Sequence, residues 1–340
     1  VWGWAKPREK VTVSFSGQTK KATADASGNW MVKFDPMKAD AKSNELKVNT
    51  ITLKDVLVGD VWIGSGQSNM EAHWGVPRAI KNEMVRMFRI PKHIASETPQ
   101  KDTEGTWISF GDGDSRKFSA VTLFFGVKLQ AELGIPVGVI DTTWSGTKID
   151  TWVPKEGKAR KGRDGSIYNG MVAPLVPFGV KGVLWYQGEY NRYSAYPKYF
   201  HALEDLIGGW RKAFQLKNLP FYLVKIPPHK WQNRGTPQTL CDNIWQAQLR
   251  AAREIENCEI APVHDSIKKL DLHPGNKRAV GLRLAELALS KAYGKDLPSS
   301  GPVFKAATFK GKEVEVSFDK IDKGLITRDG KDPSHFELSE

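Results

Sequence analysis

Four short polar segments of this sequence carry the residue types that acyl transfer on a serine requires. They lie at residues 64–71, 141–147, 187–191 and 271–276. A serine hydroxyl is a weak nucleophile and needs a base, usually a histidine, within hydrogen-bond reach. The base needs an orienting carboxylate, and the tetrahedral oxyanion needs preorganised hydrogen-bond donors. The segments together offer all of these groups, so they favour serine-dependent acyl hydrolysis.

Each segment also has a purely structural explanation when it is taken alone. The glycine-containing stretches at 66–69, 146 and 187–189 could be tight turns. The Asp-Leu-His run at 271–273 could be a loop that caps the following helix. What favours chemistry is their placement, because each of the four segments follows a strand predicted from the sequence.

The elements that must position these segments alternate between strands and helices. Apolar strands are predicted at 58–63, 135–140, 180–186, 221–226 and 259–263, and helices at about 121–133, 199–210, 239–255 and 277–293. This alternation predicts an α/β fold, a doubly wound parallel sheet with helices on both faces. Ligands of such sheets bind beyond the carboxyl ends of the strands. The four segments are therefore expected to converge on one edge of the sheet.

Alternation of apolar and polar residues predicts β structure at both ends of the chain. It occurs at 11–15, 30–34 and 46–58, and again at 314–318. We expect an N-terminal β-sandwich-like region over 1–57, an α/β hydrolytic domain over 58–298 and a partial C-terminal β region over 299–340.

The composition of the 340 residues narrows the range of partners. Lys and Arg number 50 against 38 Asp and Glu, a net charge of +12 that suits a basic surface or an anionic glycan partner. No block of five or six basic residues and no nucleic-acid-binding signature occurs, so no nucleic acid is expected. No apolar run approaches the ~18 residues of a membrane-spanning helix, so no membrane insertion is expected.

Reactive side chains outside the four segments have structural interpretations. Cys241 and Cys258 could form a disulfide or stay as two buried thiols, and their spacing does not indicate a metal site. His229 and His264 follow predicted strands and are expected to be structural or peripheral.

Three motifs resemble one known family. They are Gly-Gln-Ser-Asn-Met at 66–70, Trp-Tyr-Gln-Gly-Glu at 185–189 and Asp-Leu-His-Pro-Gly-Asn-Lys at 271–277. All three are similar to motifs of the sialate O-acetylesterase group of the SGNH hydrolases. The resemblance extends over nearly the whole chain, and it implies an SGNH-type sheet. Members of the group usually continue further at both ends, so a fragment is expected.

The resemblance implies a catalytic triad. Ser68 corresponds to the nucleophile, His273 to the general base and Asp271 to its orienting carboxylate. The wider superfamily usually has its aspartate three residues before the histidine, where this chain has Leu270. Asp265 is therefore a second candidate for the carboxylate, and a Ser-His dyad assisted by a carbonyl stays open.

The resemblance also implies an oxyanion hole. The backbone N–H groups of Ser68 and Gly146 correspond to two oxyanion donors. The third is an asparagine in the wider superfamily; here Gln187 is the nearer candidate and Asn191 the alternative. Apart from the resemblance, substrate contacts are expected from Gln67, Asn69, Glu189 and Trp144, with burial in the core as the alternative for Trp144.

The function predicted in this way is a carbohydrate O-acetylesterase that works through an acyl-serine and needs no metal or cofactor. The expected partner is an O-acetylated glycan, either 9-O-acetyl sialic acid or a related sugar, with acetylated xylan or hemicellulose as the alternative. A thioesterase or lipase-like enzyme ranks lower, and a non-catalytic carbohydrate-binding protein is the rival from another class. Such glycan substrates favour an extracytoplasmic location, either periplasmic or secreted.

Overall fold

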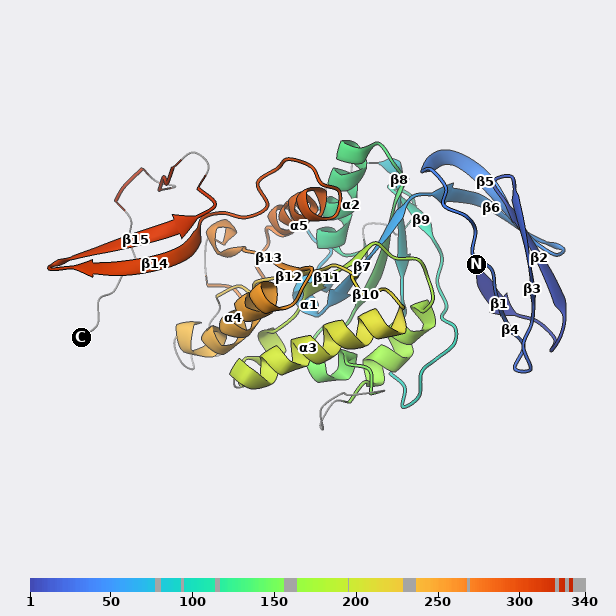
Figure 1. Cartoon of the computed structure of the whole chain (residues 1–340), viewed down its shortest axis with the longest axis horizontal. Helices are drawn as coiled ribbons and strands as arrows, with labels where there is room; N and C mark the ends of the chain where they lie inside the picture. The colour runs from blue at the N-terminus through green and yellow to red at the C-terminus, as the bar shows by residue number, and fades with distance from the viewer. Residues whose placement is uncertain are drawn as a thin grey trace.

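A seven-stranded sheet forms the centre of the computed structural model (Figure 1). The structure describes residues 1–76, 81–92, 95–113, 117–155, 164–194, 196–228, 237–267, 270–321, 324–327 and 330–332. The strand order is β13-β12-β11-β7-β10-β8-β9, and every neighbouring pair is parallel except β8 and β9. The bounds are β7 (Asp60–Gly66), β8 (Asn82–Arg89), β9 (Ile108–Phe110), β10 (Val137–Thr143), β11 (Gly182–Tyr186), β12 (Phe221–Val224) and β13 (Cys258–Ala261).

Helices cover both faces of this sheet, as the sequence predicts (Figure 1). On one face α2 (Ala120–Leu133) packs against α5 (Lys277–Lys291), and on the other α3 (Tyr196–Ala213) packs against α4 (Pro237–Glu254). Neighbouring strand residues point to opposite faces, so Trp62 joins the core under α2 and α5 whereas Ile63 joins the core under α3 and α4. The predicted doubly wound α/β fold is confirmed.

The helix ends follow local chemistry. The Ser119 side chain accepts a hydrogen bond from the backbone N–H of Thr122 and so caps α2, which ends at Gly134 with a φ of 67°. In the same way the Asn276 side chain accepts from the N–H of Ala279 and caps α5. That cap fixes the start of α5 immediately after the Asp-Leu-His segment.

An antiparallel sheet of order β3-β2-β5-β6 and a β1-β4 pair form the N-terminal part. Their bounds are β1 (Trp2–Trp4), β2 (Lys10–Phe15), β3 (Gln18–Thr23), β4 (Asn29–Met31), β5 (Asp40–Val48) and β6 (Ile51–Val58). Val13 from the larger sheet and Trp30 from β4 share one buried cluster, which gives the expected sandwich-like packing. Near the C-terminus β14 (Val303–Lys310) and β15 (Glu313–Asp319) form a hairpin that extends away from the central sheet (Figure 1). The three-part domain division stays a prediction.

Several strands were not predicted from the sequence because their apolar pattern is weak. β3 is Gln-Thr-Lys-Lys-Ala-Thr and lies at a sheet edge, where polar side chains are tolerated. β8 carries Arg86 and Arg89, which pair with Asp55 and Asp141. The expected strand at 30–34 is shorter than predicted, since β4 ends at Met31.

Both cysteines are buried free thiols. Burial raises the pKa of the Cys258 thiol to about 12, so the group stays protonated. Of the two alternatives open from the sequence, the disulfide is therefore wrong. Among the described helices, none has the length and apolar character needed to cross a membrane.

Two glycine-to-alanine variants test the close contact between α2 and α5. A Cβ at Gly281 would lie 2.6 Å from the Val121 carbonyl oxygen, whereas a Cβ at Gly208 in α3 meets nothing within 4 Å. Gly281→Ala should lower the free energy of unfolding by ~1–3 kcal/mol through overpacking. The matched variant Gly208→Ala should raise it by ~0.5–1 kcal/mol because alanine favours the helix. Urea unfolding of the two variants measures these changes in the free energy of unfolding. Equal effects in both would contradict the close contact between α2 and α5.

Candidate active site

The carboxyl end of β7 delivers Ser68 to the edge of the sheet. Gly66 has a φ of 136°, and a Cβ there would lie 2.1 Å from the Tyr186 carbonyl oxygen, so only glycine fits. The N–H of Gln67 donates to that same carbonyl at 3.0 Å. The chain then enters the short helix α1 (Ser68–Glu71), in which Ser68 is partly exposed between buried neighbours.

Ser68 and His273 meet across 205 positions of sequence. The Ser68 Oγ and the His273 Nε2 are 2.9 Å apart, within hydrogen-bond distance. Ser68 comes from the end of the central strand, and His273 comes from the loop between β13 and α5. The sequence predicted that these two segments converge, and the structure places the two reactive atoms together.

Asp271 contacts the histidine loop through its backbone. The Asp271 Oδ1 accepts a hydrogen bond from the backbone N–H of His273 at 2.9 Å. No hydrogen bond joins the carboxylate to the imidazole within the described part of the chain. The negative charge of Asp271 nevertheless acts on the ring, because it raises the pKa of His273. In this geometry Asp271 holds the loop and favours the imidazolium from a short distance.

Asp265 and His264 lie away from the Ser68–His273 pair. The Asp265 carboxylate pairs with the guanidinium of Arg283, with its Oδ1 2.6 Å from Nη1. Trp245 packs edge-on against His264, and burial lowers the pKa of that imidazole to about 4. Asp265 is therefore committed to another partner, and His264 is structural as expected. His229 lies outside the described residues.

The two predicted backbone donors are open. The N–H groups of Ser68 and Gly146 have no acceptor among the residues that the structure describes. Gly146 adopts a φ of 71° in the turn after β10. The neighbouring N–H of Ser145 is occupied, because it donates to the Glu71 carboxylate at 2.8 Å, and Glu71 also pairs with Lys92. Glu71, which sequence reasoning missed, thus fixes the turn that carries Gly146.

The contacts of Gln187 do not support its predicted role as the third oxyanion donor. Its amide nitrogen already lies near three protein oxygens: Asn191 Oδ1 at 2.8 Å, Thr147 O at 3.0 Å and Gln67 Oε1 at 3.1 Å. The two hydrogens of this buried amide are therefore taken. The amide of Asn191 is also buried; its oxygen accepts from the N–H of Ile149, and its nitrogen lies 3.4 Å from Ser194 Oγ. Both amides hold neighbouring loops together.

Asn69 and Glu189, which the sequence led us to expect as sugar contacts, are both buried, at 0% and 2% exposure. The Asn69 Nδ2 donates to Glu189 Oε1 at 2.5 Å and to the Leu272 carbonyl at 2.8 Å. The Asn69 Oδ1 accepts from the buried ammonium of Lys277. One amide therefore ties the helix of Ser68 to the loop of His273 and to the segment after β11.

Burial sets the electrostatics of this cluster. Burial raises the pKa of Glu189. The hydrogen bond from Asn69 and the charge of Lys277 oppose this rise. Burial lowers the pKa of Lys277 to about 8, opposed by Glu189 and Asp271. At His273 burial also lowers the pKa, Lys277 lowers it further, and Asp271 opposes both.

The remaining predicted contacts lie beside the pair. The Gln67 Oε1 accepts from Gln187 and from the N–H of Tyr190, while the Gln67 Nε2 has no partner among the described residues. Trp144 is half-buried against the core. Sequence reasoning missed Trp74, which is 42% exposed and lies with its ring centroid 5.5 Å from the Lys277 Nζ. Two residues separate Trp74 from α1, and that nearness to Ser68 is the signal that could have found it.

The doubly wound sheet, with Ser68 and His273 side by side at its carboxyl edge, is the arrangement expected of an SGNH-type hydrolase. Residues 58–290, more than half of the chain, match the family described as "Carbohydrate esterase, sialic acid-specific acetylesterase". The chain belongs to this family. The expected class of enzyme, a carboxylic ester hydrolase of the carbohydrate O-acetylesterase type, is thereby confirmed at the level of the family.

Individual relatives agree with this assignment. The chain is 30% identical to sialate O-acetylesterase of Homo sapiens, with 89% of this chain and 69% of that protein covered. It is 26% identical to sialate O-acetylesterase of Rattus norvegicus, with 100% of this chain and 78% of that protein covered. Among solved structures, a carbohydrate acetylesterase from Xanthomonas citri superposes with a TM-score of 0.80 at 33% identity, covering 94% of this chain and 77% of that one.

The electrostatics of His273 can be measured by NMR titration of its imidazole. We expect a midpoint below the ordinary 6.5, because burial and Lys277 both disfavour the imidazolium. Asp271→Asn keeps an oxygen acceptor for the backbone N–H of His273 but removes the charge that raises the pKa of His273. In this variant the midpoint of His273 should therefore be lower still. A midpoint at or above 6.5, or an upward shift in Asp271→Asn, would contradict this arrangement.

Proposed function

We propose that this chain hydrolyses acetyl esters of sugar hydroxyls with Ser68 as the nucleophile and His273 as the general base. The observation that carries the proposal is the 2.9 Å approach of Ser68 Oγ to His273 Nε2, beside two backbone N–H groups with no acceptor among the described residues. Membership of the carbohydrate esterase family supports the same chemistry. A non-catalytic sugar-binding protein would not need this combination.

In the first half of the reaction His273 Nε2 accepts the proton of Ser68 while the Oγ attacks the acetyl carbonyl carbon. The oxyanion that forms accepts hydrogen bonds from the N–H groups of Ser68 and Gly146, and preorganised donors of this kind lower the barrier. The C–O bond to the sugar then breaks, and His273 returns the proton to the sugar oxygen. The sugar alcohol leaves, and the acetyl group stays on Ser68.

In the second half water replaces the sugar. His273 accepts a proton from the water as its oxygen attacks the acetyl carbon, and the same two N–H groups stabilise the second oxyanion. The bond between the acetyl group and Ser68 breaks, His273 returns the proton to the Ser68 oxygen, and acetate leaves. The lowered pKa of His273 supports this role, because a base must be neutral to accept a proton.

Asp271 is proposed to act as the third member of the triad by positioning the His273 loop and stabilising the imidazolium with its charge. Its bond to the backbone N–H of His273 and its effect on the pKa of His273 support both parts. The third oxyanion donor is better assigned to Gln67 than to Gln187. The Gln67 oxygen is fixed by two hydrogen bonds, and its Nε2 has no partner among the described residues.

Exposed aromatic rings beside the pair are proposed to bind the sugar. Trp74 and Tyr190 are both more than 40% exposed, and Tyr190 is tied to Gln67 through its backbone N–H. Flat aromatic surfaces of this kind combine an apolar face with a polar edge, as sugar rings do. The partly buried Trp144 can extend the same wall.

The sugar itself is proposed from the family, whose description and relatives point to an O-acetylated sialic acid. The 9-O-acetyl form is the one expected from the sequence. Acetylated xylan is the alternative, since the catalytic groups would treat either acetyl ester alike. A glycan substrate also favours the extracytoplasmic location, periplasmic or secreted, that the sequence led us to expect.

Acetate release tests the nucleophile and the sugar together. Ser68→Ala should lower kcat by more than about 10³-fold, because the groups of a triad act as a unit. Wild type and variant are compared on 9-O-acetyl sialic acid, acetylated xylan and an aryl acetate, with circular dichroism confirming the fold. Activity on one glycan names the substrate. A folded variant that keeps most of its rate on every ester would exclude Ser68 as nucleophile.

A second experiment tests the aromatic wall. Trp74→Ala should raise KM for the acetylated sugar by about twofold to tenfold and leave kcat near wild type. The reason is that a ring which stabilises the bound substrate and the transition state to the same extent contributes to binding but not to the rate of the bound complex. The matched control Phe309→Ala removes an exposed ring from the C-terminal hairpin and should change neither constant. An unchanged KM in Trp74→Ala would remove this residue from the proposed site.

A further inference from the structure

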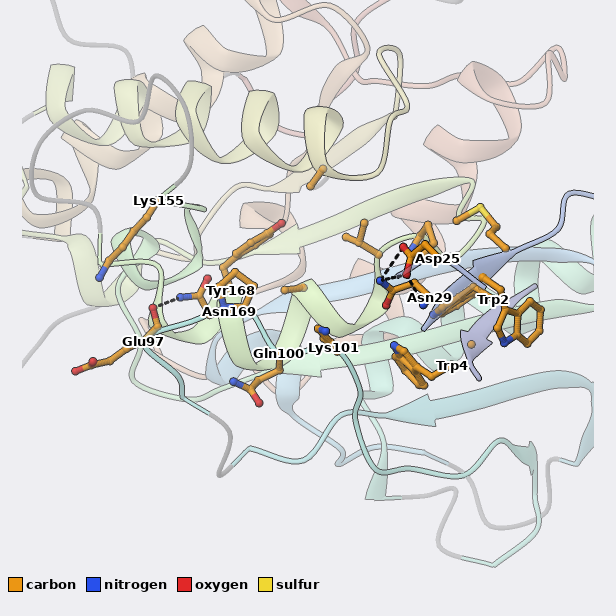
Figure 2. A pocket seen from close by; sticks show the side chains of 18 residues that line it. Trp2, Trp4, Asp25, Asn29, Glu97, Gln100, Lys101, Lys155, Tyr168 and Asn169 are labelled. Atoms are coloured by element: carbon orange, nitrogen blue, oxygen red, sulfur yellow. Dashed lines mark hydrogen bonds between the residues drawn. The ribbon is translucent and has the colours of Figure 1, made fainter. Parts of the chain in front are cut away.

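A cavity of about 880 Å³ lies between the N-terminal strands and the α/β part (Figure 2). Strands β1 and β4 form one wall, and residues 97–101 together with 168–177 contribute to the other. None of the residues of the proposed ester site lines this cleft.

One side of the cleft lies toward the amino ends of the parallel strands. Val176 and Pro177 line it shortly before β11 begins, and Ala213 lines it where α3 ends. Ser68 instead follows the carboxyl end of β7, which has seven residues. At ~3.3 Å per residue the two edges of the sheet are ~20 Å apart. A molecule bound in the cleft would therefore contact different residues from those that surround the ester at Ser68.

Indole rings form an apolar surface in the cleft. Trp4 is 46% exposed, and Trp2 is partly exposed and packs edge-on against Phe178 with ring centroids 5.8 Å apart. By contrast Trp62 and Trp185 of the central sheet are fully buried. Large exposed apolar groups gathered in a concave site usually mark a binding surface.

A buried amide adds an open acceptor to this surface. Asn169 is only 3% exposed, lines the cleft and donates through Nδ2 to the carbonyls of Ser96 and Glu97. Those bonds fix its orientation, while its Oδ1 has no partner among the described residues. A fixed amide oxygen at an apolar wall accepts a hydrogen bond from a hydroxyl group. Figure 2 shows Asn169 beside Tyr168 and Gln100, across the cleft from Trp4.

The charges around the cleft balance although the chain carries +12. Asp25 and Glu97 contribute two carboxylates, and Lys101 and Lys155 contribute two ammonium groups. An anionic ligand would find no excess of cations here. The combination of indole faces, an open amide and zero net charge fits an uncharged polyhydroxyl ligand.

We propose that this cleft is a second carbohydrate-binding site, which takes a neutral segment of several sugar rings. Such a segment would stack on Trp4 and donate a hydroxyl hydrogen to Asn169 Oδ1. The proposal rests on the proposed function in one respect, since a glycan esterase is exposed to chains of which only some rings are acetylated. A site in this cleft would retain such a chain while another part of it occupies the Ser68 site.

Equilibrium binding to the full chain tests the cleft without hydrolysis. Ser68→Ala protein is titrated calorimetrically with xylohexaose, cellohexaose and mannohexaose, and with 3′-sialyllactose as the anionic probe. At least one neutral hexasaccharide should bind. Adding Trp4→Ala should weaken that binding by about tenfold, the size expected when one stacking ring is removed. Trp4→Phe keeps a flat ring and should retain most of the affinity, and Phe309→Ala should leave it unchanged.

Three outcomes would overturn the proposal: no neutral probe binds, the sialylated probe alone binds, or binding disappears in Trp74→Ala and persists in Trp4→Ala. The last would place the sugar at the ester site. Aryl acetate hydrolysis by wild type and by Trp4→Ala is measured in parallel and should be equal. Failure of wild type to hydrolyse any ester would count against the proposed function, whereas loss of hexasaccharide binding counts against the cleft alone.

Discussion

The buried side-chain amide of Asn69 is the contact on which the active-site arrangement depends. It bridges Glu189, Lys277 and the Leu272 carbonyl, and so joins three segments that are far apart in the sequence. Burying a carboxylate and an ammonium group is favourable only when both are paired and hydrogen-bonded. Asn69 meets that requirement by donating to one group and accepting from the other. Because it adjoins Ser68, the same bonds set the distance between the nucleophile and the loop of His273.

The groups that we propose for catalysis at this edge are available because the hydrogen-bonding groups of their neighbours are occupied. Glu71 takes the N–H of Ser145 and thereby fixes the turn in which the N–H of Gly146 has no acceptor among the described residues. Gln187 uses its amide on surrounding loops, which leaves the oxygen of Gln67 fixed and its nitrogen open. In the proposed mechanism such saturation of the supporting hydrogen bonds leaves the few unsatisfied donors for the oxyanion.

Sequence reasoning predicted the features that depend on strand position but did not reveal the contacts that depend on burial. The strands covered on both faces, such as β11 with all five residues buried, were predicted from continuous apolar runs. Ser68 and His273 were predicted to meet because each follows a strand of one parallel sheet. By contrast, Asn69 and Glu189 are polar residues in a loop motif, and nothing local indicates that they bond to each other inside the core. The role of Lys277 was equally hidden, since an ammonium at a helix start is ordinarily exposed.

Because of the position of Lys277, a change in its charge affects His273 and the buried Glu189 differently. Its ammonium lowers the pKa of His273 and opposes the rise in the pKa of Glu189, yet its own pKa is lowered to about 8. His273 is already neutral well below that pH, so loss of the Lys277 proton leaves the base unchanged. Above pH 8 it is Glu189 that loses its counter-charge, and it then keeps only its hydrogen bonds, from the Asn69 amide and from the backbone. Alkaline conditions should therefore act on the buried cluster that holds the site together before they act on the reacting groups.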